Sequence, residues 1–187
     1  MNMKRIWSIF LCTFLTLFFC ICSNVYSDKI DYESYTGPAY NQIQMSWNNL
    51  EVHLKQRYIQ IHEIIRSFKN YNNQDNSFVN ELNQANLEAE QAVTIIDKIK
   101  TNRKISSLLS RLFIEFEKYP KLKSDVNFLR LLEEMAATEN RIAKLRMHYN
   151  AAVLEYVSII KKMPESLKTQ QKEATFWEMP PSPKVKW

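Results

Sequence analysis

The stretch SDVNFLRLLEEMAATENRIAKLRMHYNAAVLEYVSIIKKM, residues 124–163, decides the fold of this chain. Its apolar residues recur every three or four positions, which places them on one face of a helix. They are Phe128, Leu131, Leu132, Met135, Ile142, Leu145, Tyr149, Ala152, Val153, Tyr156, Ile159 and Ile160. Ser124 and Asp125 offer an N-cap, and Pro164 follows the last turn. A helix of about 38 residues would be roughly 57 Å long, and it requires long partner helices.

Three more helices are expected before this one. The first, residues 39–71, carries one continuous apolar stripe made of Trp47, Leu50, Leu54, Tyr58, Ile61, Ile65 and Phe68. The second, residues 77–100, is capped by Ser77, and its stripe consists of Phe78, Leu82, Ala85, Ala89, Ala92, Val93, Ile96 and Ile99.

The third helix covers residues 105–119, its apolar face is formed by Leu108, Leu109, Leu112, Phe113 and Phe116, and Pro120 stops it. The sequence TNRK, residues 101–104, leaves open whether the second and third helices are continuous. Gly37 is the only glycine, which argues against hairpin-rich β folds because their tight turns depend on glycine. The predicted fold class is all-α, with an N-terminal transmembrane or signal helix followed by an elongated antiparallel four-helix bundle.

The N-terminal residues predict a membrane segment. Residues 6–25, IWSIFLCTFLTLFFCICSNV, carry no charge, and about 20 helical residues span a hydrocarbon core of roughly 30 Å. Lys4 and Arg5 precede this segment, so the positive-inside rule places the N-terminus in the cytoplasm and residues 28–187 outside. We favour a retained single-pass anchor in the cell membrane. The alternative is a signal peptide cleaved near Ser27, which would release a periplasmic or secreted bundle.

This interpretation divides the chain into four parts. The second part lacks apolar periodicity, and its last residue, Pro38, suits the first turn of a helix. The fourth part is rich in proline and cannot be regular, although Phe176 and Trp177 could fold back onto the bundle. The parts are a membrane anchor or signal segment (1–27), a linker (28–38), the bundle (39–165) and an irregular C-terminal tail (166–187).

Composition excludes several classes of function. The 25 basic and 20 acidic residues give a net charge of +5, and they are too interspersed to predict nucleic-acid binding. Cys12, Cys20 and Cys22 are the only cysteines, so a thiolate zinc site is excluded from the bundle.

The histidines do not complete a metal motif either. Helical di-iron sites need Glu-x-x-His, but Leu50, Ile59 and Leu145 stand three residues before the three histidines. No Gly-x-Ser-x-Gly turn can be written. The sequence therefore predicts a protein without catalytic, cofactor-binding or metal-binding residues. A helical enzyme or metal protein remains the less favoured alternative.

One polar cluster on the longest predicted helix stands out. Glu139 and Arg146 are seven residues apart and share a face with Tyr149 and Asn150. One hypothesis is a polar interaction spot for a partner. The other, which we favour, is a structural layer in which Glu139 pairs with Arg146 or with an arginine of another helix and Asn150 sets the register.

Residues 117–153 carry a long run of spaced residues: Glu117-x-Tyr119-Pro120-x-Leu122, Phe128, Leu131, Glu134, Thr138-Glu139-Asn140-Arg141-Ile142-Ala143 and Arg146-x-x-Tyr149-Asn150-x-Ala152-Val153. In order and spacing this pattern resembles the LemA family. Trp47, Leu50, Val52, Leu54 and Arg57 extend it, so it covers residues 45–165. The chain departs from the family where Ile59-Gln60-Ile61-His62 replaces an Asp-Leu-Ile-Pro run, which predicts a straighter helix.

The resemblance implies an N-terminal membrane helix followed by a helical bundle, and it implies no settled biochemical activity. We therefore predict a membrane-anchored, non-catalytic interaction or scaffold protein of the cell envelope. Its expected partners are the lipid bilayer, through residues 6–25, and an unidentified protein. Self-association into a homo-oligomer stays open, and nucleic acid is excluded.

Overall fold

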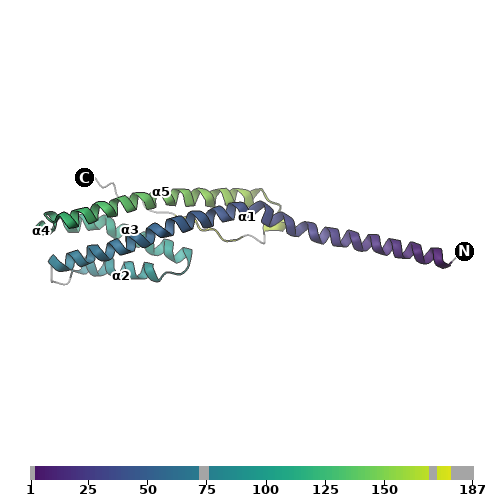
Figure 1. Ribbon diagram of the computed structural model, residues 1–187, viewed down its shortest axis with the longest axis horizontal. Coiled ribbons are helices and arrows are strands. Elements are labelled where there is room, and N and C mark those ends of the chain that lie inside the picture. The colour runs from purple at the N-terminus through teal and green to yellow at the C-terminus, as the bar shows by residue number, and fades with distance from the viewer. Residues whose placement is uncertain (1–2, 72–75, 169–171, 178–187) are drawn as a thin grey trace.

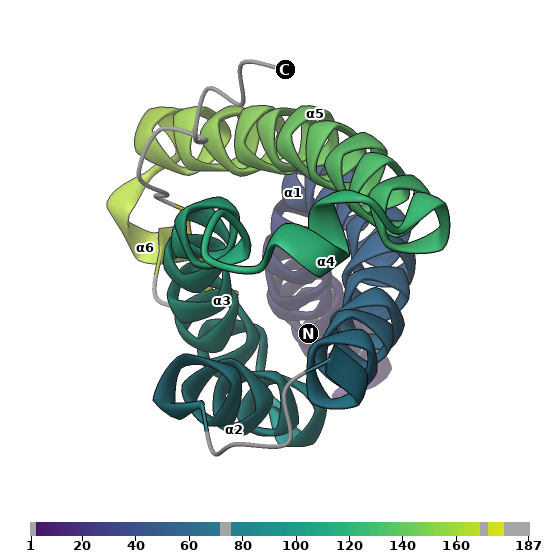
Figure 2. The same ribbon diagram turned by 90° about the vertical axis from the view of Figure 1, so that its left-hand side faces the viewer.

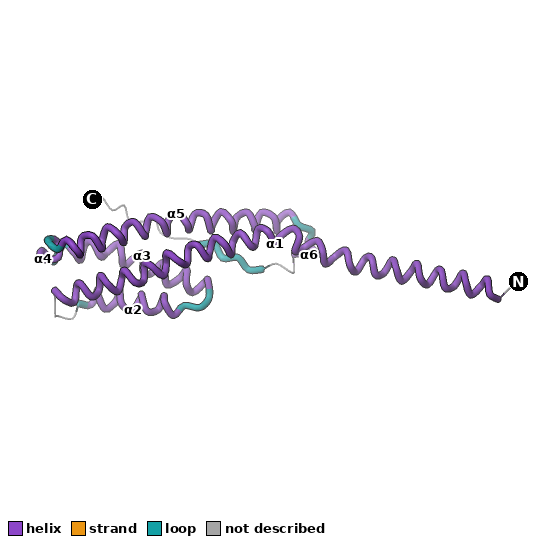
Figure 3. The backbone as a smooth tube through the Cα atoms, viewed as in Figure 1, coloured by secondary structure: helices purple, strands orange, loops and turns teal. Residues whose placement is uncertain are grey.

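The computed structural model describes the backbone of residues 3–71, 76–168 and 172–177. Within these ranges it describes side chains from residue 33 onward, apart from Tyr71, Phe113 and Ser166. All regular structure in this part of the chain is helical (Figure 3). The helices are α1 (Met3–Tyr71), α2 (Ser77–Gln91), α3 (Ile95–Phe116), α4 (Pro120–Lys123), α5 (Val126–Lys162) and α6 (Glu165–Lys168). The predicted all-α class is confirmed.

Helices α1 and α5 form an antiparallel spine along the bundle (Figure 1). The α1 stripe predicted from the sequence is buried throughout, and nine of the twelve predicted α5 residues are buried as well. Four contacts between α1 and α5 follow a single antiparallel register along the whole spine. They are Tyr40 with Tyr156, Trp47 with Tyr149, Arg57 with Glu139, and Phe68 with Phe128.

The α2–α3 hairpin covers only part of this spine. It lies beside the half of the bundle that contains the end of α1 and the start of α5 (Figure 1). Seen end-on, α1, α2, α3 and α5 surround a common interior, and α4 lies across one end (Figure 2). The other half of the spine is covered by residues 172–177, which return along α5 after α6.

Helix α1 is continuous from Met3 to Tyr71 and projects far beyond the bundle (Figure 1). Residues 28–38, which the sequence predicted to be a linker without apolar periodicity, are helical and part of this rod. Pro38 lies inside the helix, where it removes one backbone hydrogen bond. The helix tolerates the proline because Thr36 and Ala39, on either side of it, are buried and anchor this turn to the bundle.

Among the residues whose side chains are described, no helix is both long enough and apolar enough to cross a membrane. Residues 6–25, the membrane segment predicted from the sequence, lie outside that part of the chain.

The break between the second and third helices lies at residues 92–94, not at residues 101–104. Thr94 forms a helix start, because its Oγ1 accepts a hydrogen bond from the Asp97 backbone N at 3.1 Å and donates to Asp97 Oδ2 at 2.7 Å. The predicted stripe fails at this break: Val93 is 85% exposed and Ile96 is 52% exposed. The signal that could have located it is Thr94-x-x-Asp97, a capping-box pattern.

Two other helix starts show what short polar side chains contribute. Asp125 caps α5 as expected, accepting hydrogen bonds from the backbone N of Asn127 and Phe128. At α2 the cap is Asn76 rather than Ser77, because the amide oxygen of Asn76 reaches two backbone N–H groups while Ser77 is already helical. Helix α3 ends at Phe116, three residues before the predicted end at Tyr119, and Pro120 begins the short helix α4.

Candidate functional site

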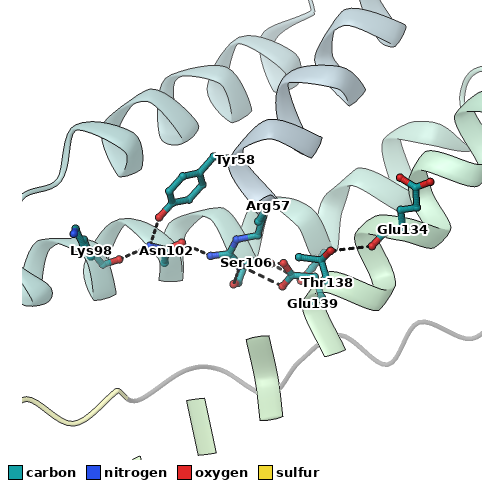
Figure 4. Close-up of polar contacts among 9 residues, drawn as sticks. Arg57, Tyr58, Lys98, Asn102, Ser106, Glu134, Thr138 and Glu139 are labelled. Carbon is teal, nitrogen blue, oxygen red and sulfur yellow. Dashed lines mark hydrogen bonds and ion pairs between the residues drawn. The ribbon is translucent and has the colours of Figure 1, made fainter. Parts of the chain in front are cut away.

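A buried arginine lies at the centre of the bundle. Arg57 on α1 is fully buried, and its guanidinium points toward α3 and α5 (Figure 4). Its Nη1 lies 3.1 and 3.2 Å from the carboxylate oxygens of Glu139 and 3.2 Å from Ser106 Oγ. Its Nη2 donates to Asn102 Oδ1. A charge inside a protein is tolerated when it is paired and hydrogen-bonded, and Arg57 meets both conditions.

Helix α3 supplies the neutral half of this network. Asn102 and Ser106 are four residues apart, so they face the same side of the helix. The Asn102 amide donates to Tyr58 Oη and to the backbone oxygen of Lys98, both at 2.7 Å. Burial raises the pKa of Tyr58, although the hydrogen bond from Asn102 and the charge of Arg57 act in the opposite direction. The phenol therefore stays neutral and serves as a hydrogen-bonding group.

Glu139 connects this network to the outer edge of the bundle. Its side chain is 30% exposed, whereas that of Arg57 is completely buried. Arg146 lies within electrostatic range of both groups. Burial lowers the pKa of Arg146; Glu139 raises it and Arg57 lowers it further. One carboxylate thus faces two guanidinium groups, and the only ion pair of Glu139 among the described residues is with Arg57.

Tyr149 and Asn150 hold the C-terminal segment. Tyr149 Oη donates to the backbone oxygen of Thr175 at 2.7 Å. The Asn150 amide donates to the backbone oxygen of Trp177 and accepts from its backbone N, both at 3.0 Å. These two hydrogen bonds satisfy both backbone groups of Trp177, much as pairing with a neighbouring β-strand would. Burial raises the pKa of Tyr149 to about 12.

The indole of Trp177 fills the groove that these hydrogen bonds define. It is 1% exposed, and its ring centroid lies 6.0 Å from that of Trp47. Trp47 in turn meets Tyr149 edge-on at 5.4 Å, an arrangement that aromatic pairs favour. Phe176, the other tail residue expected to fold back, is 40% exposed. The tail therefore closes the apolar interior on the side that α2 and α3 do not reach.

The four residues singled out from the sequence thus divide into two groups. Glu139 pairs with the arginine of another helix, one of the two pairings considered, and Arg146 lies beside it. Tyr149 and Asn150 bind the tail rather than setting the register of two helices. Tyr149 is buried, whereas Glu139, Arg146 and Asn150 are only partly buried.

The sequence did not reveal the centre of the network. Arg57 adjoins the apolar stripe of α1, but nothing in its neighbourhood predicts which distant residues it meets. Asn102 lies in residues 101–104, where the sequence leaves open whether two helices are continuous, and Ser106 lies at the start expected for the third helix. Asn102 lies three residues from both Ile99 and Ile105 in the apolar stripe of α3. This polar residue within an apolar face was the available signal for a buried polar contact.

The described residues offer little for metal chemistry. They contain no group of three or more His, Cys, Asp or Glu residues close enough to hold a metal ion. His62 does approach a carboxylate, with its Nε2 2.9 Å from Glu90 Oε1, but this pair is exposed.

Two hollows lie along the bundle, and one of them borders the network at Tyr58 and Lys98. One, of about 370 Å³, lies where α1 enters the bundle and is lined by Tyr35, Ile159, Lys162, Met163, Pro164 and Leu167. The other, of about 210 Å³, lies near the turn between α2 and α3 and is lined by Glu51, Leu54, Lys55, Tyr58, Ala89, Glu90, Ala92 and Lys98. The first is mainly apolar. The second contains the ion pair between Lys98 and Glu51.

Comparison with known protein families identifies this architecture. The family model described as the LemA family matches residues 46–184, about three quarters of the chain. The chain belongs to the LemA family. Among curated proteins, no match reaches significance. The LemA match includes Arg57, Asn102, Ser106 and Glu139, and it continues through residues 172–177. The docked tail is therefore part of the LemA region, which extends beyond residue 165, where the sequence resemblance had been placed.

Proposed function

We propose that this LemA-family chain is a single-pass membrane protein that holds a rigid helical bundle outside the cytoplasm. In this proposal residues 6–25 cross the bilayer and the bundle binds another protein of the cell envelope. The chain performs no chemistry of its own. It acts as a scaffold that presents a helical surface at a fixed distance from the membrane.

The observation that carries this proposal is the continuity of α1. Its 69 residues form one helix, and at 1.5 Å per residue that helix is roughly 100 Å long. The N-terminal part of this helix extends away from the bundle, and it contains the uncharged segment 6–25 (Figure 1). A helix without an interruption transmits the orientation of this segment to the bundle, as a scaffold requires.

The polar interior supports the non-catalytic part of the proposal. A catalytic group has to reach a substrate, but Arg57 is fully buried and its guanidinium is engaged by α3 and α5. The hydroxyl of Tyr149 is engaged by the backbone of Thr175. These groups stabilise the bundle and leave its outer surface as the place for recognition.

Membrane anchoring is tested by cell fractionation and by sequencing the N-terminus of the mature protein. We expect the chain to stay in membranes washed with alkaline carbonate and to retain residues 1–27. A charged residue at the centre of a transmembrane helix costs about 2.5–3.5 kcal/mol, so Leu15→Arg should weaken this retention. Tyr35→Arg, on the exposed part of α1, is the matched control and should not. A mature protein that begins at Asp28 would contradict the anchor and favour the secreted alternative.

The orientation of the bundle is tested by labelling a single cysteine. In a chain with Cys12, Cys20 and Cys22 replaced by serine, Met147→Cys places a thiol on the exposed outer face of α5. A maleimide that cannot cross the cytoplasmic membrane should label it in intact cells, after outer-membrane permeabilisation where an outer membrane is present. Labelling only after lysis would contradict an extracytoplasmic bundle.

The scaffold role is tested by capturing the intact protein from membranes and identifying what is bound. A partner that is captured from detergent-solubilised membranes and is lost when residues 39–177 are deleted supports the proposal. Stoichiometric iron or zinc in the purified chain would instead support the alternative of a metal protein.

A further inference from the structure

The outward face of α1 within the bundle is almost free of charge. Between residues 38 and 59, ten residues are exposed, and Lys55 is the only charged one among them. The other nine are Pro38, Asn41, Gln42, Met45, Asn48, Asn49, Val52, Gln56 and Ile59. By contrast, α5 has 18 exposed residues, of which eight are charged. A solvated helix face normally carries charges, so the α1 face calls for another explanation.

The apolar residues on this face follow a seven-residue repeat. Met45, Val52 and Ile59 are 61%, 64% and 62% exposed, and they lie opposite the core stripe of the same helix. The amides Gln42, Asn49 and Gln56 precede them by three residues each. The two sets therefore occupy the a and d positions of a heptad pattern, with amides at a and apolar residues at d. These six residues form what we call the outer seam of α1.

The chemistry of the outer seam favours an identical partner. Two copies packed around a parallel two-fold axis bring each residue opposite its own counterpart, so a charge in the seam would face the same charge. The six seam residues carry none. An asparagine at an a position hydrogen-bonds to the same asparagine of a parallel, in-register partner, and Asn49 occupies the middle a position of the seam.

The proposed membrane anchor sets the relative orientation of the two copies. Two chains inserted in one membrane project their α1 helices in the same direction, and residue 49 of each chain lies at the same height. The seam from Gln42 to Ile59 is about 26 Å long and contains fewer than the three to four heptads that sustain a coiled coil alone. It would therefore associate weakly in solution and more strongly where tethering raises the local concentration.

We propose that the outer seam is a self-association surface through which two membrane-anchored copies pair with their α1 helices parallel and in register. This inference rests on the proposed membrane anchoring. It assigns the face of α1 opposite the core to a second copy of the chain, and it leaves the remaining surface of the bundle for other partners.

Disulfide trapping in membranes tests the pairing. In the full chain with Cys12, Cys20 and Cys22 replaced by serine, single cysteines are placed at the d positions with Met45→Cys, Val52→Cys or Ile59→Cys. Met147→Cys on the outer face of α5 is the control, because its 63% exposure matches theirs. On oxidation we expect each seam variant to form a homodimer several-fold more efficiently than the control.

The pattern across the three positions identifies the orientation. A parallel pair joins each position to itself. An antiparallel pair would join residue 45 of one copy to residue 59 of the other, which two differently tagged variants in the same cell would reveal. Preferential trapping of that mixed pair overturns the proposal, as do trapping no better than the control and seam cysteines that join a different protein.

A charge in the seam provides an independent test. Val52→Glu places two carboxylates opposite each other and should reduce co-capture of two tagged copies to background, whereas Met147→Glu should not. Equal co-capture by both variants contradicts the proposal. Carbonate washing of the same membranes separates the two ideas: loss of the chain from the membrane defeats the anchor, whereas a retained chain without trapping defeats only the pairing.

Discussion

Arg57 and Glu139 are 82 residues apart in the sequence, yet the guanidinium Nη1 of one lies 3.1 and 3.2 Å from the two carboxylate oxygens of the other. The pair joins the bundled part of α1 to α5, and α3 supplies two further acceptors for the guanidinium, whose buried Nε has no partner among the described residues. Because the guanidinium is buried, it cannot replace a lost partner with bulk water. The stability of the bundle should therefore depend on Glu139 more than on any exposed acidic residue.

Glu139→Gln tests this dependence. The amide keeps an acceptor but removes the charge opposite Arg57, and charge-assisted hydrogen bonds contribute about 1.5–3 kcal/mol. We expect the free energy of unfolding to fall by about that amount in urea titrations followed by circular dichroism. Glu134→Gln is the control, since its ion pair with Arg130 is exposed and such pairs contribute about 0–1 kcal/mol. Equal effects of the two substitutions would contradict a structural role for the buried pair.

The docked tail can be tested at Trp177. Trp177→Ala removes a fully buried indole, and such truncations cost about 3–5 kcal/mol. Phe176→Ala removes a neighbouring ring that is 40% exposed, so a smaller loss of about 1–2 kcal/mol is expected. Thermal unfolding of the two variants should differ clearly. A melting temperature for Trp177→Ala equal to that of the native chain would show that the segment does not stabilise the bundle.

Because the helix breaks at residues 92–94, two isoleucines of the same predicted stripe should contribute differently to the free energy of unfolding. Ile99→Ala should lower the free energy of unfolding by about 2–5 kcal/mol because Ile99 is buried in the core. Ile96→Ala should change it by no more than about 0.5 kcal/mol because Ile96 is mainly exposed. Chemical denaturation of both variants measures the difference. If they lost similar stability, residues 77–100 would form one helix, as first predicted.

Alkaline pH should destabilise the bundle through Tyr149. Its pKa is raised from about 10 in the unfolded chain to about 12 in the folded chain. The folded state therefore holds a proton that the unfolded state has released, and stability falls as the pH rises from 10 to 12.

The corresponding measurement is the melting temperature across this range, for the native chain and for Tyr149→Phe. Tyr149→Phe should show a smaller fall, because the group responsible is gone, although the buried Tyr58 contributes a similar effect. Identical slopes in the two proteins would exclude Tyr149 as the titrating group.

Local sequence signals were sufficient for the two helices of the spine. In α5, Asp125 marks the start, Pro164 marks the end, and the apolar stripe between them is interrupted only near the buried Thr138, so the bounds and most of the buried face were predicted. The stripe of α1 was predicted for the same reason. The start of α1 was not, because Pro38 normally begins a helix and here lies inside one.

The network around Arg57 shows where such signals fail. The partners of Arg57 on α3 and α5 lie between 45 and 82 residues from it in the sequence, and helical periodicity describes only neighbours within a few turns. Glu139 was recognised as a residue that pairs with an arginine, but the identity of that arginine depends on the antiparallel register. Trp177 was a candidate for folding back, whereas its two hydrogen bonds to Asn150 required the three-dimensional structure.

The position of Trp177 beside Trp47 also matters while the protein is being synthesised. A ribosome makes Trp47 early and must add another 130 residues before Trp177 exists. Until then, the half of the spine that residues 172–177 later cover exposes an apolar surface that includes two tyrosines and a tryptophan. Helices that have already packed together lack this cover until residues 172–177 are made. The nascent protein is therefore most prone to aggregation and proteolysis on that side.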